Sequence, residues 1–528
     1  MLTTGYLNSH ACSQRMEMSQ PAHPCIYRVC CRHVHKRSRS QQPGRSCPRR
    51  CPCYSCRDIS MPWVCWRPKR PQRNRRLEYP RRPLQPSRPV SPVAVAVPQT
   101  TDQIRKAVLC GKGLGIKVTG RSGGHSYANY GLGGDNAHLV IELSRMSDVS
   151  FDKETNVATV QAGARLGHLA TVLYEKHGRA VAHEHAPGAD NIPSVGVSGH
   201  FAHGGFGFSS HMHGLALDFV VGATVRRNSG GLGDGEHGPV LGYWGAGSNY
   251  GIIASWRLRT IEAPTTLTYF GVSLGWKQST AVAGLSALEQ YAKNDMPREL
   301  NFRVSDYNRG APGIEGLYYG TDKQMRAAIE PLLTKAAPKA TFSLSKTVNW
   351  KEAVTYYAFN ETIDWTWPSP QENFYAKSLA LKGLNGTSAQ NFVDYWFETA
   401  NKVVDRNWWF QLDMHGGQNS AISQVSNRDT AYAHRDKLFI IQFYDRVPND
   451  AVYPAADGFS LLDGWADATT APLPASDWGK YINYVDANLD QATAQRLYYG
   501  VNLPRLQQLK AKYDPEELFW YPQSIKPA

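Results

Sequence analysis

Two glycine-dense stretches decide the fold: RSGGHSYANYGLGG at residues 121–134 and SVGVSGHFAHGGFGFSSHMHGLALD at residues 194–218. Glycine lets a backbone turn tightly and approach a ligand with no Cβ atom in the way. Successive N–H groups in such turns form a concavity that suits a pyrophosphate. The second stretch matches neither a Rossmann fingerprint nor a P-loop. Two such loops with strand patterns between them indicate a long ligand in a cleft, and a dinucleotide is the natural candidate.

The sequence around these loops predicts short strands and helices. Thr101 is expected to cap a helix that begins near Asp102, with Ile104, Val108 and Leu109 on its apolar face. A further helix is expected at Leu166–His177, and short strands are expected at 116–119, 138–143 and 157–161. Short strands, helices and glycine-dense loops together are typical of an α+β fold.

From Leu267 the sequence changes to longer alternating strands. They are LTYFGVSLGW, NFRVSDY, NFYAKSLAL, WWFQLDMHG and KLFIIQFYDR, with amphipathic helices from Ser279 and from Thr321. This pattern predicts an antiparallel sheet with helices on one side. Trp409, Gln411 and Asp413 are spaced by two and therefore share a face of their strand. That face is either the wall of a site or a solvated surface, since antiparallel sheets often have one.

The charge of the chain is concentrated at its amino terminus. Residues 1–90 hold 19 of the 58 Lys and Arg residues and 3 of the 44 Asp and Glu residues. They are rich in Arg, Pro, Ser and Cys, which predicts a disordered tail. Such a tail is either a nucleic-acid-binding segment or sequence without function, and we favour the second. We expect no partner nucleic acid, and no run of eighteen apolar residues suggests a membrane span.

A metal site is the other reading of the cysteines and histidines. Cys47, Cys51, Cys53 and Cys56 lie in the tail, but their spacing fits no zinc pattern well. The second group consists of histidines in the second glycine-dense stretch: His200, His203, His211 and His213. No Cys or acidic ligand lies at a useful spacing from them, so we expect no metal there.

Several motifs carry a resemblance to a known family. The strand before RSGGHSY, the stretch at 194–218 and GAGSNYGI at 245–252 resemble the FAD-binding domain of the vanillyl-alcohol-oxidase superfamily. ENFYAKSLALK, WFQLDMHGGQNS, SDWGKYINYVD and YYGVNLPRLQQLKAKYDP are similar to glucooligosaccharide oxidases, of the berberine-bridge-enzyme-like group. The resemblance covers about residues 93–527 and implies an α+β fold with a two-part FAD-binding domain and a substrate domain.

The resemblance also implies the boundaries. After the tail at 1–90, we expect the FAD-binding domain at 91–264 and the substrate domain at 265–490. Residues 491–528 are expected to return to the FAD-binding domain.

The resemblance implies a covalent flavin. His125 is expected to carry FAD through its 8α-methyl group. The other expected cofactor-binding residues are Arg121, Ser122, Gly123, Gly124, Ser126, Tyr127, Val195, Gly196, Ser198, Gly199, Gly204, Gly205, Gly207, Gly251, Ile252 and Asn502.

The resemblance further implies the reaction. Tyr484 is the expected general base, and Asp413 is expected to share a hydrogen bond with it. The reducing-end hemiacetal of an oligosaccharide is expected to become a lactone while dioxygen becomes hydrogen peroxide. The expected substrate-binding residues are Tyr127, Glu372, Trp409, Gln411 and Gln442. We also expect a monomer, and an extracellular protein although no secretion signal is visible.

The sequence departs from the family in two internal places. Close relatives attach flavin a second time through a cysteine before a proline, whereas Ile192 precedes Pro193 here. At most one covalent link, through His125, is therefore expected. Residues 226–245 are unusually glycine-dense for a packed domain. Two other functions therefore remain open: oxidation of a secondary-metabolite alcohol, and a catalytically damaged homologue.

Overall fold

The structure is a computed structural model, and the residues it describes all belong to one of two compact units, residues 59–528. The described ranges are 88–182, 192–227, 232–234, 246–308, 310–360, 362–364, 371–448 and 451–528. Residues 1–87 of the expected tail, with its cysteines, and most of the 226–245 stretch lie outside them. Within these ranges no helix is long and apolar enough to cross a membrane. The same ranges contain no group of three or more His, Cys, Asp or Glu residues arranged to hold a metal ion.

The first glycine loop follows a small parallel sheet. Its strand order is β1 (Ala94–Ala96), β3 (Leu139–Glu142) and β2 (Val118–Arg121). Helix α2 (Thr101–Gly113) connects β1 to β2 and is capped by Thr100, one residue earlier than expected. Ile104 and Val108 are buried as predicted, but Leu109 is 37% exposed. The helical turn of 100° per residue moves Leu109 off the buried face that Val108 occupies.

The second glycine loop leads into a five-stranded antiparallel sheet. The strand order is β4 (Val149–Asp152), β5 (Val157–Gln161), β9 (Ile252–Arg259), β7 (Val220–Arg226) and β8 (Leu232–Asp234). Helix α3 (Leu166–His177) contributes to the same apolar core, together with Trp256 of β9. A separate pair joins β6 (Arg179–Ala180) to β10 (Ile261–Glu262).

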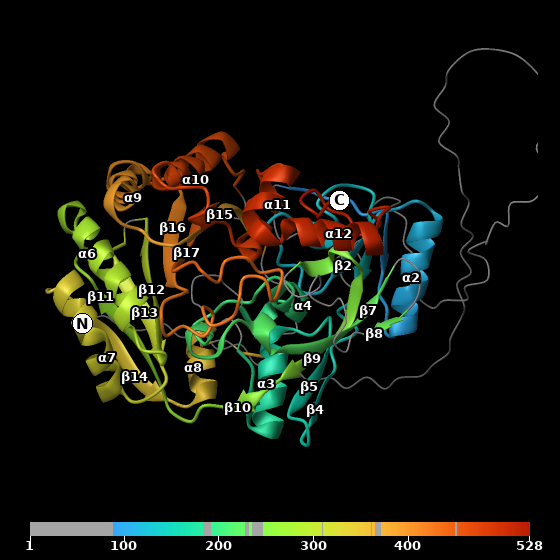
Figure 1. Ribbon diagram of the computed structural model, residues 1–528, viewed down its shortest axis with the longest axis horizontal. Coiled ribbons are helices and arrows are strands. Elements are labelled where there is room, and N and C mark those ends of the chain that lie inside the picture. Colours follow the sequence, from blue (N-terminus) through green and yellow to red (C-terminus); the bar gives the residue numbers. More distant parts are fainter. Residues whose placement is uncertain are drawn as a thin grey trace, which may run out of the picture. The chain divides into compact units, whose positions relative to one another are not determined.

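The carboxy-terminal helices join this first core. Helices α11 (Gln491–Tyr499) and α12 (Leu503–Tyr513) bury Tyr498, Tyr499 and Leu506 in the same cluster as the residues of α2 and β9. Figure 1 shows α11 and α12 on the side that carries β2 and β7.

An eight-stranded antiparallel sheet forms the rest of the described chain. Its order is β14 (Thr341–Val348), β11 (Leu267–Ser273), β13 (Gly313–Tyr318), β12 (Leu300–Tyr307), β16 (Asn407–Met414), β17 (Phe439–Val447), β15 (Asn373–Leu381) and β18 (Trp478–Gly479). The long alternating strands predicted from the sequence are therefore confirmed. The protein has the α+β fold that the sequence predicted.

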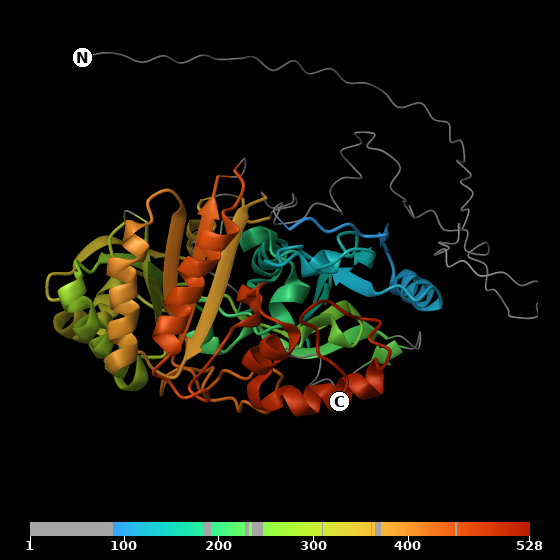
Figure 2. The same cartoon turned by 90° about the horizontal axis from the view of Figure 1, so that it is seen from above.

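Helices cover one face of this sheet. The apolar cluster beneath the sheet contains residues of α6 (Gln278–Gln290), α7 (Asp322–Ala336), α9 (Gly386–Glu398) and α10 (Ala455–Thr470). Figure 2 shows α9 and α10 running alongside the strands. Helix α8 (Trp350–Tyr357) instead packs with Leu267 and Phe208 in a separate cluster.

The other face of the sheet carries the polar residues singled out in the sequence. Asp413 lies opposite Ile440, Gln411 opposite Gln442, and Trp409 opposite Tyr444. Residues directly opposite in an antiparallel pair project to the same face. The prediction that Trp409, Gln411 and Asp413 share one face is confirmed, and we call this face the site face of the sheet.

Candidate active site

The two glycine-dense loops touch at Gly123 and Gly196. A Cβ atom on Gly123 would lie 2.1 Å from the backbone nitrogen of Gly196, which no other residue type would allow. Gly196 also forms a backbone bridge with Arg165, just before α3. Close backbone approach at this point holds the loops side by side, as two walls of one cleft would require.

His125 lies where the loops meet. Its Nε2 atom is 2.8 Å from the hydroxyl of Ser194. Burial, together with the positive charges of Arg165 and Arg121, lowers the pKa of His125 to about 3. The imidazole is therefore neutral near pH 7.

Several of the predicted cofactor-binding side chains hold the loops in place. Ser122 and Ser198 both donate hydrogen bonds to the carbonyl of Ala162, at 2.6 and 2.8 Å. The Ser126 hydroxyl accepts a hydrogen bond from the backbone N–H of Tyr130. The bonds of Ser122 and Ser198 connect both glycine loops to Ala162, which directly follows β5.

Two other predicted cofactor residues are engaged with protein groups. Arg121 donates to Glu142 at 2.7 Å inside the core. The Asn502 amide donates to backbone carbonyls of Asn427 and Thr430, which ties α12 to the 427–431 loop. The remaining predicted positions lie along the same loops and at the start of β9: Gly124, Val195, Gly199, Gly204, Gly205, Gly207, Gly251 and Ile252. Gly205 has φ +74°, a conformation that favours glycine.

Tyr484 ends the short 3-10 helix η10 (Ile482–Tyr484), which the second glycine loop anchors. Tyr481 directly precedes η10. Its hydroxyl accepts hydrogen bonds from the backbone N–H groups of Gly205 and Phe206 at 3.0 and 3.1 Å. The Tyr481 N–H donates to the Ser378 hydroxyl of β15. Tyr484 is thus held between the glycine loop and the site face.

Tyr127 connects the histidine loop to the same place. Its hydroxyl accepts a hydrogen bond from the Gln442 amide at 2.9 Å. Its ring is parallel to the ring of Tyr484, with 6.2 Å between centroids and 6° between planes. The ring of Phe374 packs edge-on against it at 5.0 Å. The structure therefore brings together three residues predicted separately, Tyr127, Gln442 and Tyr484.

Aromatic and charged groups extend the site face outward. Trp409 stacks on Tyr444 at 4.7 Å, and the Tyr444 hydroxyl donates to Glu372. Burial, with the charge of Glu372, holds the pKa of Tyr444 well above its usual range, so the phenol stays protonated. Arg446 lies 3.5 Å from the other oxygen of Glu372 and is partly exposed. Sequence reasoning missed Tyr444 and Arg446, although both continue the alternation that begins at Gln442.

Asp413 is paired with a residue that sequence reasoning also missed. Its Oδ1 atom accepts a hydrogen bond from Nε of Arg303 at 2.9 Å, and both side chains are buried. No donor among the described residues reaches Oδ2. The hydrogen bond expected between Asp413 and Tyr484 stays a prediction, and the partner that the structure shows for Asp413 is Arg303, across from it on β12. Burial raises the pKa of Asp413, and Arg303 opposes that rise.

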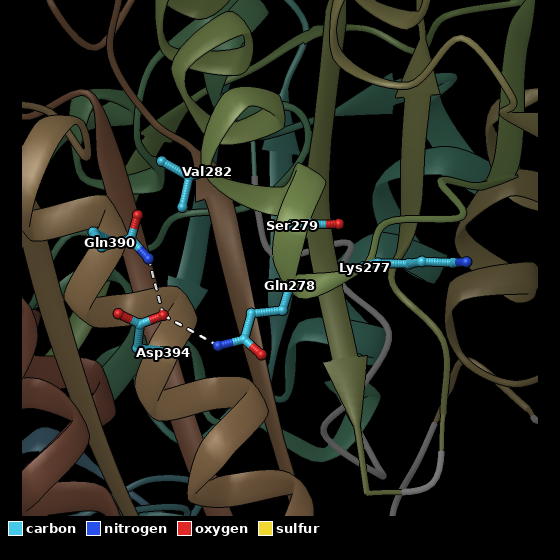
Figure 3. A pocket seen from close by; sticks show the side chains of 6 residues that line it. All are labelled: Lys277, Gln278, Ser279, Val282, Gln390 and Asp394. Atoms are coloured by element: carbon cyan, nitrogen blue, oxygen red, sulfur yellow. Dashed lines mark hydrogen bonds between the residues drawn. The ribbon is translucent and has the colours of Figure 1, made fainter.

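A separate pocket lies on the helix-covered side of the sheet (Figure 3). It is lined by Lys277, Gln278, Ser279, Val282, Gln390 and Asp394. The amides of Gln278 and Gln390 both donate to Asp394. None of the residues predicted for the active site lines it, so it belongs to the outer layer formed by α6 and α9.

The loops, the neutral histidine and the tyrosine-lined face together define a flavin-dependent oxidoreductase. Residues 92–232 match the family model described as "FAD binding domain", and residues 480–526 match "Berberine and berberine like". The chain belongs to the berberine-bridge-enzyme-like family of FAD-linked oxidases and is an FAD-dependent carbohydrate oxidoreductase acting on CH–OH groups.

Named relatives are oligosaccharide oxidases. The chain is 53% identical to a carbohydrate oxidase of Microdochium nivale over 82% of this chain and 88% of that protein. The crystal structure of that oxidase with a substrate analogue superposes with a TM-score of 0.84, covering 87% of this chain and 97% of the other at 50% identity. A xylooligosaccharide oxidase of Thermothelomyces thermophilus is 46% identical over 82% of this chain and 87% of its own length.

A third relative bears on the cofactor. One solved structure addresses the functional roles of the 6-S-cysteinyl, 8α-N1-histidyl FAD in glucooligosaccharide oxidase from Acremonium strictum. It is 38% identical and has a TM-score of 0.82, covering 87% of this chain and 97% of the other.

Proposed function

We propose that this enzyme oxidises the reducing-end hemiacetal of an oligosaccharide to a lactone and passes the electrons to dioxygen, which leaves as hydrogen peroxide. The meeting of Tyr127, Gln442 and Tyr484 beside the His125 loop carries this proposal. A candidate base, a candidate sugar-binding amide and the loop of a candidate flavin anchor support the proposal by their contacts with one another.

The residues of the cleft fit FAD with one covalent link. Gly123 and Gly196 let the two glycine loops approach each other closely, and the half-buried His125 of the first loop is neutral. We propose His125 as the single point of attachment, since Ile192 stands where relatives of the resembled group have cysteine. When bound, FAD supplies the acceptor for the hydride that leaves the anomeric carbon.

Tyr484 is the proposed base for the anomeric hydroxyl. A phenol is a weak base, because its ordinary pKa is about 10. The site must therefore stabilise the ionised phenol or accept its charge while the proton moves. The unpaired Oδ2 of Asp413 is the polar atom that substrate binding would bring into use beside it. This is the role we propose for Asp413 in place of a permanent hydrogen bond to Tyr484.

The site face would hold the sugar rings. Gln411 and Gln442 lie opposite each other and present amides suited to sugar hydroxyls. Trp409 presents an aromatic face, supported by its stack on Tyr444. Glu372, at the far end of this row, is placed to bind a second ring. A few placed polar groups on an otherwise apolar wall are typical of a small-molecule site.

The two main apolar cores support a division of the chain into two domains. We propose that 91–264 with 491–528 forms the FAD-binding domain and 265–490 the substrate domain, because α11 and α12 share their core with α2 and β9. Resemblance further suggests an extracellular monomer. Assay of culture supernatant against cell extract, and light scattering of the purified protein, test those two points.

Substrate screening and one substitution test the proposal. Cellobiose, maltose and xylobiose should each be assayed for peroxide and for the matching aldonic acid. Tyr484→Phe should lower kcat by about 10²–10⁴-fold while flavin remains bound, since only the proton acceptor is lost. Tyr395→Phe is the matched control, because that hydroxyl bonds Ser460 on the helix layer. Full turnover by Tyr484→Phe would refute the assignment of the base.

A further inference from the structure

The turn that carries Tyr484 begins and ends at buried residues of opposite charge. Lys480 directly follows β18, and Asp486 lies two residues after Tyr484. The two side chains form an ion pair, with 3.2 Å between Nζ of Lys480 and Oδ2 of Asp486. This ion pair closes residues 480–486 into a loop that contains the proposed base.

Strand β15 bonds to the same turn. Nζ of Lys480 donates to the backbone carbonyl of Ser378 at 3.3 Å. The hydroxyl of Ser378 accepts a hydrogen bond from the Tyr481 N–H at 2.9 Å. It also donates to the carbonyls of Tyr481 and Tyr484, at 3.2 and 3.4 Å. The backbone around Tyr484 is therefore fixed both to one strand residue and to the lysine at the start of the turn.

Further charged groups balance the ion pair. Lys377 of β15 lies 3.2 Å from the same carboxylate oxygen of Asp486 and also pairs with Asp463 of α10. The hydroxyl of Tyr375 donates to the other carboxylate oxygen of Asp486 at 2.7 Å. The charges of the two lysines and the two aspartates cancel when all four are ionised. Loss of one ammonium charge would leave an excess negative charge two residues from Tyr484.

We propose that Lys480 is a positioning residue for Tyr484: its positive charge holds Asp486 in the ion pair that closes the turn, and turnover requires this charge. This inference rests on the proposed function, in which Tyr484 takes the proton of the anomeric hydroxyl. It goes beyond that function by naming the group that keeps the base in place. It also sets an upper limit to the pH at which the enzyme works.

Burial brings the titration of Lys480 close to neutral pH. Burial lowers the pKa of Lys480 to about 8, although Asp486 acts to raise it. The ammonium group is therefore charged at lower pH and neutral at higher pH. Burial also acts to lower the pKa of Lys377, but Asp486 and Asp463 more than offset it, so that this pKa lies above its ordinary value. Lys377 thus keeps its charge where Lys480 loses its own.

Other titratable groups face the ion pair from the elements packed against it. They are Lys377 and Tyr375 on β15, Asp463 on α10, Tyr498 on α11 and His434 in the segment before β17. Burial holds the pKa of both tyrosines above the usual range and lowers that of His434 to about 4. These three rings therefore keep their protonation between pH 7 and 9.

The charge of Lys480 affects Tyr484 in two ways. A neutral amine no longer attracts Asp486, so the ion pair that closes the turn is lost and the phenol is held less firmly. The remaining negative charge also opposes ionisation of a phenol nearby, because like charges disfavour each other. Both effects lower the rate of proton removal, and neither requires contact of Lys480 with the substrate.

The first experiment measures kcat of the wild-type holoenzyme with cellobiose between pH 7 and 9. The value should fall on the order of tenfold, because a group that titrates near pH 8 passes from mostly charged to mostly neutral over this range. A kcat that stays constant or rises would overturn the proposal.

The second experiment changes the charge. Lys480→Met, a side chain of similar length, should have a low kcat that is nearly equal at pH 7 and 9, with flavin content unchanged. Lys480→Arg stays ionised and should keep kcat at pH 9 within about twofold of its value at pH 7. Lys437→Met is the matched control, since Lys437 is a buried lysine that pairs with Asp436 at 2.9 Å. It should keep the wild-type kcat and its fall with pH.

The variants separate this inference from the proposed function. Lys480→Met with the wild-type kcat, or with the wild-type fall between pH 7 and 9, would overturn the positioning role alone. An equal loss of kcat in Lys437→Met would also overturn it, because removal of any buried lysine would then have the same effect. Full turnover by Tyr484→Phe would instead refute the base, and with it the proposed function on which the inference rests.

Discussion

Asp413 and Arg303 meet where neither side chain reaches solvent, and one carboxylate oxygen is left without a donor. An unsatisfied buried oxygen lowers the stability of the folded chain, so its presence points to a functional use. We expect Asp413→Asn to reduce kcat by about 10²-fold, within the range of acid–base contributions, with covalent flavin unchanged. Asp306→Asn is the control, since Asp306 is a buried aspartate on the opposite face that accepts from Trp396. Equal kcat losses in both variants would show a structural effect only.

Glu372 gives a prediction about the outer sugar. It accepts from Tyr444, which stacks on Trp409, and lies beside Arg446. Interactions with a remote ring lower KM more than they raise kcat when ground state and transition state bind alike. Glu372→Gln should raise KM for disaccharides by up to about tenfold, or about 1.4 kcal/mol, with kcat nearly unchanged. Steady-state kinetics on cellobiose decide this, with Glu352→Gln, in the cap of α8, as control.

At the scale of elements, the sequence predicted which side chains of one strand share a face, but it did not predict which strands pair with each other. The face shared by Trp409, Gln411 and Asp413 follows from the period of two along one strand. Arg303 became the partner of Asp413 only through the register of β12 against β16, which depends on contacts more than a hundred residues apart. For the same reason Ser194 went unnoticed beside His125, since the two loops meet only in three dimensions.

Local signals were reliable where they lay within one element. The helix expected at Leu166–His177 has those bounds in the structure, and so does the strand at Val157–Gln161. The prediction that Leu109 is buried was wrong, because an apolar residue at the margin of the apolar stripe of a helix can face the core or the solvent. The cofactor loops were predicted from glycines and from resemblance, whereas the hydrogen bonds that tie them to Ala162 involve distant backbone groups.

The turn that carries Tyr484 gives the prediction for this scale. The Tyr481 hydroxyl accepts from two backbone N–H groups of the second glycine loop. Tyr481→Phe would leave both donors buried without that acceptor, at about 1–3 kcal/mol each. We expect lower kcat and faster amide exchange at residues 204–206. Hydrogen–deuterium exchange measures this directly, and unchanged protection there would mean that the loop is held by other contacts.

Across the described chain, the segments around the site face of the eight-stranded sheet are bonded to the two glycine loops and to Asp218 at several separate points. Gln442 bonds Tyr127, Tyr481 bonds Gly205, and Arg435 forms a two-pronged ion pair with Asp218. Bidentate pairs of this kind are specific in geometry as well as strong. Disturbance of the glycine loops should therefore reach the site face.

Histidines whose pKa lies below the ordinary value make the stability of the folded chain sensitive to acid. In five histidines the loss of hydration is the largest cause of a lowered pKa. The pKa falls to about 3 in His415 and to about 4 in His203, His211, His213 and His434. Their ordinary value in an unfolded chain is about 6.5. Between these values the unfolded chain binds protons that the folded one does not. This part of the stability is complete above about pH 6.5 and is lost as the pH falls toward 4.

Buried carboxyl groups act in the opposite direction, because burial raises the pKa of Glu315 to about 7 and of Asp306 to about 6 and also raises those of Asp413 and Asp445. The folded chain binds these protons first, so acid favours it. We expect the five histidines to dominate over the four carboxyls between pH 7 and 5, because more groups titrate in that direction. We therefore expect Tm, measured calorimetrically on the holoenzyme, to fall steadily from pH 7 to 5. A constant or rising Tm would mean that the carboxyls dominate, and His415→Gln, which removes one titrating ring, should make the fall shallower if the histidines are its cause.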